Sequence, residues 1–169
     1  AGLVLIPTAA IAADQAKIES KFGVANANKG EVSYQSSTSA KTDDTIAAQV
    51  WYHNTENADS GKIANNLKVK IDLPKAAGKT QKLTGTVSAD NSNVVTNTPT
   101  VNLDLEQSRL EYVPGSAQWR HNKGTNQSPV WVTESISDSV VNGGIVLENT
   151  KPCFNFEGSV TIKMRVKTD

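Results

Sequence analysis

The chain has 169 residues, with 17 basic and 17 acidic side chains, two histidines and one cysteine. This length suits a single domain with a buried core. The balanced charge argues against a nucleic-acid partner, because proteins that bind nucleic acid concentrate lysine and arginine on one face. The lone cysteine, Cys153, excludes an intramolecular disulfide, and we expect it to be a small buried side chain.

The most apolar run of the sequence is its first one, Ala1 to Ala13. It has the apolar middle and small residues of a secretory signal, and the absence of a starting methionine leads us to expect processing. Pro7 and Asp14 make the run too short to span a membrane, which takes roughly 20 apolar residues. The same shortness argues against the assembly helix of a type IV pilin.

Within this run, Leu3-Val4-Leu5-Ile6 is β-prone and ends sharply at Pro7. It therefore predicts an extended strand that fills a groove in a sheet. That groove belongs either to the same molecule or to a neighbouring copy, as in donor-strand complementation.

The next segment, Asp14 to Gly23, predicts one short helix. Asp14 can cap it, Ile18 and Phe22 fall on one face at helical spacing, and Gly23 can end it. Residues 24–29 follow as a polar connector. We therefore expect residues 1–30 to form an arm, a short helix and a linker in front of a body over residues 31–169.

From Glu31 onward the pattern is that of β-structure, with about eight to ten short strands separated by Gly, Pro and Asn turns. Period-2 alternation marks strands with one wet face. The body is therefore predicted to be an all-β, antiparallel β-sandwich. The expected strands include Val32 and Tyr34, Ile46–His53, Leu67–Leu73, Gln81–Ser88, Thr100–Leu105, Leu110–Val113, Val130–Val132, Ile145–Leu147 and Ser159–Val166, with a polar loop over Ser36–Asp44.

The sequence carries little that points to catalysis. His53 and His121 have no metal-ligand spacing and are expected to be exposed or hydrogen-bonding side chains. A phosphate loop, a catalytic carboxylate pair and a nucleophile elbow are all missing, so we expect neither an enzyme nor a cofactor.

Calcium is the one metal to weigh, and its candidate ligands are Asp59 and Asp90 in two polar loops. Neither loop has the spacing of an EF-hand, and Asp and Asn are common in tight turns for backbone reasons alone. Trp51, Trp119 and Trp131 either line a carbohydrate groove or pack in the core or an interface. Asn126-Gln127-Ser128 is a glycosylation sequon.

Two stretches resemble a β-sandwich repeat domain of bacterial and archaeal surface proteins. The first is Gln49 to Asn54 with Ala64 to Pro74, and the second is Leu110 to Ala117, which contains Tyr-Val-Pro-Gly-Ser, with the closing strand Gly158 to Lys167. In that family the Tyr-Val-Pro-Gly-Ser motif forms a hairpin. The resemblance covers Gln49 to Lys167 and implies an immunoglobulin-like fold on or outside the cell surface, without supplying a catalytic residue.

Together these features predict a structural subunit of an extracellular, pilus-like filament. Leu3, Val4, Leu5 and Ile6 are the predicted donor strand, and the expected partner is another copy of the chain, with no membrane span. The alternative is a monomeric cell-surface adhesin whose arm folds onto its own sheet and whose loops bind a glycan or a protein.

Overall fold

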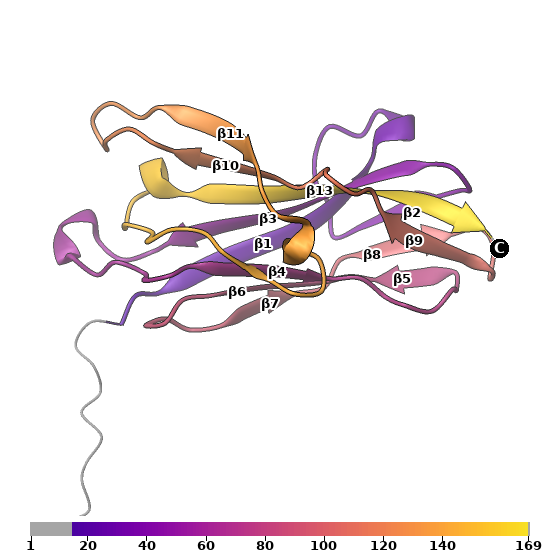
Figure 1. Ribbon diagram of the computed structural model, residues 1–169, viewed down its shortest axis with the longest axis horizontal. Helices are drawn as coiled ribbons and strands as arrows, with labels where there is room; N and C mark the ends of the chain where they lie inside the picture. Colours follow the sequence, from indigo (N-terminus) through magenta and orange to yellow (C-terminus); the bar gives the residue numbers. More distant parts are fainter. Residues whose placement is uncertain (1–14, 169) are drawn as a thin grey trace, which may run out of the picture.

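The computed structural model describes residues 15–168, so the predicted donor strand Leu3–Ile6 lies outside the described residues. Within this range the helical segments are four 3₁₀ turns of three residues each, η1 to η4. The rest is strand and loop, which confirms the all-β prediction (Figure 1). The strands are β1 (Ile18–Asn26), β2 (Ser37–Ala40), β3 (Thr45–Asn54), β4 (Lys68–Asp72), β5 (Thr80–Lys82), β6 (Thr84–Ser88), β7 (Val95–Asn97), β8 (Thr100–Leu103), β9 (Ser108–Tyr112), β10 (Gln118–Asn122), β11 (Trp131–Ser135), β12 (Ile145–Val146) and β13 (Gly158–Thr168).

The largest sheet has the order β1-β3-β13-β10-β11, and β9 also pairs with β13. Every pairing in this sheet is antiparallel. β3 and β13 lie at its centre and are its two longest strands, with 10 and 11 residues. The strands at the two ends of this order, β1 and β11, are therefore the edges that decide what else can pair with the sheet.

Two smaller sheets complete the fold. One has the order β12-β4-β6-β7 and is antiparallel, and the other has the order β2-β8-β5. β2 and β8 run parallel, which departs from the predicted antiparallel pattern. β2 also lies within Ser36–Asp44, where the sequence predicted a polar loop.

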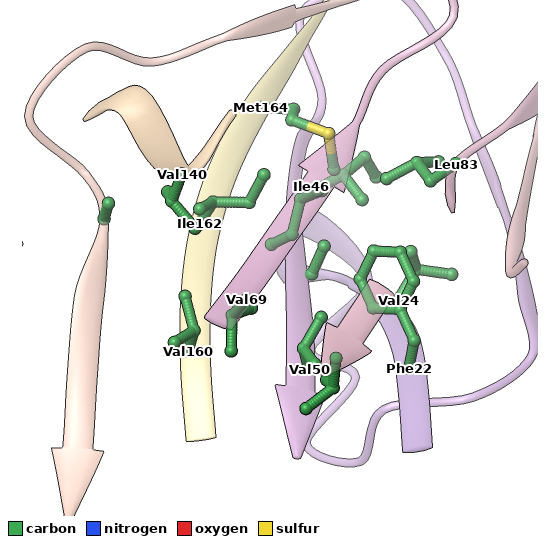
Figure 2. Packing of buried hydrophobic residues seen from close by; sticks show 14 of the residues in the cluster. Phe22, Val24, Ile46, Val50, Val69, Leu83, Val140, Val160, Ile162 and Met164 are labelled. Atoms are coloured by element: carbon green, nitrogen blue, oxygen red, sulfur yellow. The ribbon is translucent and has the colours of Figure 1, made fainter. Parts of the chain in front are cut away.

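The core lies between the large sheet and the β4 sheet. Alternate residues of β13 (Val160, Ile162 and Met164) are fully buried, as is Val69 of β4. Figure 2 shows the three β13 side chains along the core, with Val69 beside Val160 and Val140 beside Ile162. The alternation predicted for Ser159–Val166 and for Leu67–Leu73 therefore places one face of each strand in the core.

The helix prediction for Asp14–Gly23 is wrong, because residues from Ile18 onward form β1 and pair with β3 along its whole length. Ile18 and Phe22 are buried on one face, as predicted, but they share that face with Val24. A spacing of four residues satisfies the periods of both a helix and a strand, so it could not decide between them. The connector predicted for residues 24–29 is the end of β1 followed by η1 (Ala27–Lys29).

The Tyr-Val-Pro-Gly-Ser segment does not form a hairpin. It joins β9 to β10, and both of these strands pair with β13, one beyond the other along its length. Gly115 adopts φ 75° in this turn, and its N–H donates to both carboxylate oxygens of Asp138. At this turn, the strand that pairs with β13 changes from β9 to β10.

Candidate functional site

The outer edge of β1 is covered by asparagine side chains from the β6–β7 region. Asn93 Oδ1 accepts from the Ile18 N–H at 2.8 Å, and Asn93 Nδ2 donates to the Ile18 carbonyl at 2.8 Å. This pair of bonds reproduces what a residue in a neighbouring strand would make. Asn97 Nδ2 donates to the Ser20 carbonyl at 3.1 Å.

Backbone groups bond at two further positions on or next to this edge. Val24 and Gln35 exchange both N–H to carbonyl bonds, at 2.8 and 2.9 Å, and the Ala16 N–H donates to the Asn91 carbonyl. β1 therefore meets polar partners at both ends and in the middle, and little of its edge remains to pair with another strand.

The opposite edge, β11, is different. The bonds Lys123 N–H to Val130 C=O and Ile136 N–H to Ala117 C=O fix which β11 residues point toward β10. By alternation, Val132 and Glu134 bond to β10, and the N–H and C=O groups of Trp131, Thr133 and Ser135 point away from the sheet. Within residues 15–168 these outward groups have no hydrogen-bond partner, and Figure 1 shows β10 on one side of β11 and no strand on the other.

Behind β11 lies a cluster around His121, whose side chain is buried. His121 Nε2 is 2.9 Å from Glu134 Oε2 on β11, and His121 Nδ1 is 3.5 Å from Glu148 Oε1, just past β12. The second distance is an ion-pair distance without a well-formed hydrogen bond. Lys123 also pairs with Glu134. The cluster therefore ties the β10–β11 hairpin to the edge of the β4 sheet.

The His121 ring lies between two carboxylates, those of Glu134 and Glu148. A neutral imidazole carries one ring N–H and can donate to only one of the two carboxylates. Burial raises the pKa of Glu148 above its usual value, against the attraction of His121. Hydrogen bonds from Lys123 and His121 lower the pKa of Glu134. Burial therefore favours the protonated form of Glu148, whereas the hydrogen bonds favour the ionised form of Glu134.

Trp119 stacks on His121 and is itself hydrogen-bonded to Tyr52. The Trp119 ring stacks on His121 with centroids 3.4 Å apart and planes 6° apart, and Trp119 Nε1 donates to the Tyr52 hydroxyl at 2.8 Å. Burial raises the pKa of Tyr52 well above its usual value, so this hydroxyl stays neutral. Gly158, opposite Tyr52, leaves room for the ring, because a Cβ there would overlap the Tyr52 hydroxyl and ring carbons.

A second histidine lies on the outer face of the large sheet. His53 is buried, stacks on Phe154 with centroids 4.0 Å apart, and has Nδ1 3.0 Å from Glu19 Oε1. Trp51 lies beside it, with Nε1 donating to Glu157 at 2.9 Å. Both predicted histidines thus make hydrogen bonds, but neither is exposed.

The calcium candidates are not brought together with other acids. Asp59 is exposed in η2 (Ala58–Ser60), and Asp90 is exposed after β6, where it accepts from Asn66 at 2.7 Å. Among residues 15–168, no three His, Cys, Asp or Glu side chains gather as a metal site. The neighbouring Asn54 is fully buried and donates to the Lys62 and Thr150 carbonyls, so it holds the loop together.

Cys153 and the sequon meet in one loop cluster. The Cys153 thiol is half-buried and donates to Asn126 Oδ1 at 3.2 Å, and Asn155 donates to the same oxygen at 2.8 Å. Two donors therefore hold the Asn126 side chain against the residue 153–155 turn.

Comparisons with protein-family models, curated proteins and solved structures found no match to this chain. In the part of the chain that the structure describes, no helix is long and apolar enough to cross a bilayer.

Proposed function

We propose that this chain is a structural subunit of an extracellular filament, in which Leu3–Ile6 of one copy inserts as a strand into the next. The observation that carries the proposal is the core. A continuous cluster running from Ala16 to Val166 spans both sides of the sandwich, so the fold builds its interior from the described residues. The most apolar run of the sequence lies outside the described residues, and its strand-forming composition suits insertion into another copy.

The energetics favour such an insertion. Burying four large apolar side chains gives on the order of 6–10 kcal/mol of transfer free energy before the costs of ordering and association. Residues 7–15 link the donor to Ala16, whose N–H bonds to Asn91, and nine residues at full extension reach at most about 30 Å, enough to arrive at an adjacent subunit. A contact that is head-to-tail and does not close gives a helical fibre.

An extracellular location is part of the proposal. It is supported by the resemblance of Gln49–Lys167 to repeats of surface proteins. The β-rich, Asn- and Thr-rich sandwich is compatible with that setting.

Deletion of Ala1–Thr8 tests the proposal. The full chain is expected to form fibres visible by electron microscopy, and the deletion variant is expected to remain a β-rich monomer of lower stability. A Leu5→Asp variant of the full chain is expected to stop assembly, because it places a charge in the apolar strand, whereas Ala9→Asp, beyond Pro7, is the matched control. A full chain that stays monomeric at high concentration, with no effect of the deletion, contradicts the proposal.

The second candidate function is a monomeric surface adhesin, favoured by aromatic side chains on the outer face of the large sheet. Phe154 is 63 % exposed, and the Arg120 guanidinium lies 4.2 Å from the Trp131 ring centroid. Trp119 is engaged inside the His121 cluster, so Trp131→Ala is the variant that tests glycan binding. Loss of binding in this variant of a monomeric chain supports the adhesin.

A further inference from the structure

We propose that the outward edge of β11 is the acceptor for the donor strand, so that Leu3–Ile6 of a neighbouring copy pairs with Trp131, Thr133 and Ser135. This inference rests on the proposed function and adds the surface at which the two copies meet.

The first argument is the availability of backbone groups. At the β1 edge, Asn93, Asn97 and Gln35 bond to outward groups of Ile18, Ser20 and Val24. At the outer edge of β9, the Ser108 carbonyl accepts from Gly78 and the Leu110 N–H donates to Gln81. Among these edges, β11 is the one on which no outward backbone group has a partner among the described residues.

The second argument is length. β11 has five residues, which matches the four residues of Leu3–Ile6 followed by Pro7, since Pro7 has no N–H and ends the ladder. The edges of the β4 sheet, β12 and β7, have only two and three residues. A donated strand thus finds its longest unpaired partner at β11.

The third argument is the side-chain pattern of the edge. Edge strands that avoid pairing often carry proline or lysine, and β11, which reads Trp-Val-Thr-Glu-Ser, has neither. Its one charge, Glu134, is engaged by His121 and Lys123 behind the strand. Trp131 and Thr133 are instead suited to lie beside the apolar side chains of an added strand.

The fourth argument is the surface next to the edge. Val132 of β11 is half-buried, and Ile136, Ile145 and Leu147 are half-buried and pack against the core from the segment that follows. The His121–Glu148 contact places this segment on the same flank as β11. Alternate donor side chains would extend this apolar surface, and the other half would lie beside Trp131.

The test compares two proline variants of the full chain. Thr133→Pro removes an outward N–H of β11 but none of the bonds to β10, because proline is tolerated where the N–H faces away from the sheet. Ser20→Pro is the control, since the Ser20 N–H also points outward, at the β1 edge, although this change also removes the Ser20 Oγ bond to the Trp51 carbonyl. Thr133→Pro is expected to abolish fibres and Ser20→Pro to retain them.

Hydrogen exchange supplies a second measurement that does not depend on the proline variants folding. In fibres of the unaltered chain, the amides of Trp131, Thr133 and Ser135 are expected to exchange about tenfold more slowly than in the non-assembling Leu5→Asp chain. Those of Val132 and Glu134, which already face β10, are expected to change little.

Each outcome separates the two claims. Fibres from Thr133→Pro, or unchanged exchange at β11, overturn the β11 acceptor and leave the proposed filament standing. If the Leu5→Asp chain still forms fibres and adding Thr133→Pro to it abolishes them, then β11 pairs with β11 of another copy. That result overturns donation by Leu3–Ile6. Slow exchange of the outward β11 amides in a monomeric chain shows that the arm folds onto its own β11 edge. That result overturns both the filament and the acceptor for a neighbouring copy.

Discussion

Asn93 offers a direct measure of how much side-chain amides contribute to closing the β1 edge. Replacing Asn93 by Ala removes two bonds of 2.8 Å, one to each polar group of the Ile18 backbone. A neutral hydrogen bond contributes about 0.5–1.5 kcal/mol net, and because Asn93 is exposed, water can partly replace it. We therefore expect Asn93→Ala to lower the free energy of unfolding by roughly 1–2 kcal/mol.

The assay is urea unfolding of the full chain, followed by circular dichroism and tryptophan fluorescence under non-assembling conditions. A loss of this size lowers Tm by about 2–8 °C for a domain of this length. Asn93→Asp keeps the acceptor for the Ile18 N–H and loses the donor, so its carboxylate faces the Ile18 carbonyl at neutral pH. Asn97→Ala removes one bond of 3.1 Å and is expected to cost about 0.5–1 kcal/mol.

The reasoning is refuted if Asn93→Ala is within about 0.3 kcal/mol of the unaltered chain, since that would mean the amide bonds are exchanged for water without loss. It is also refuted if Asn97→Ala costs more than Asn93→Ala, because the ranking follows from the number and length of the bonds.

Two further predictions concern the other flank. Gly158→Ala is expected to destabilise the fold by about 1–3 kcal/mol in urea unfolding, because the new Cβ displaces Tyr52. Tyr52→Phe loses only the hydrogen bond from Trp119 and is expected to cost less. Equal stability of Gly158→Ala and the unaltered chain would contradict the packing of Tyr52 against Gly158. The pKa of Glu148 is raised on folding, so its contribution to stability is present in full below its usual value of 4.5 and falls as the pH rises through the raised pKa. Glu148→Gln is expected to flatten this decline when unfolding is measured between about pH 4 and 8, and an unchanged pH profile would refute the shift.

Strands with a clean two-residue period were predictable from sequence. Leu67–Leu73 and Ser159–Val166 correspond to β4 and β13, because alternation of apolar and polar side chains directly encodes one buried face. β10 was missed because its inward residues are Trp119 and His121, and a buried histidine reads as polar in the pattern. β2 was missed for the same reason, since Ser-Thr-Ser-Ala carries no large apolar residue.

The candidate site was less accessible to sequence reasoning. The bond between Asn93 and Ile18 joins positions 75 residues apart, and no local pattern reports such a contact. The unpaired β11 edge follows from topology, because any strand looks the same in sequence whether one neighbour or two lie beside it. The pairing of His121 with Glu134 and Glu148 likewise required the hairpin and β12 to be placed on one flank.

The unequal flanks bear on the direction of the proposed assembly. A sandwich with two free edges accepts a strand on either side, and its copies associate into irregular sheets. Here Asn93 and Asn97 occupy the β1 edge, while the His121 cluster fixes β11 from behind and leaves its outward groups free. One donor and one acceptor per copy is the stoichiometry that a linear head-to-tail polymer requires. In the proposed filament, closure of the β1 edge therefore matters as much as exposure of β11, because it is what keeps growth one-dimensional.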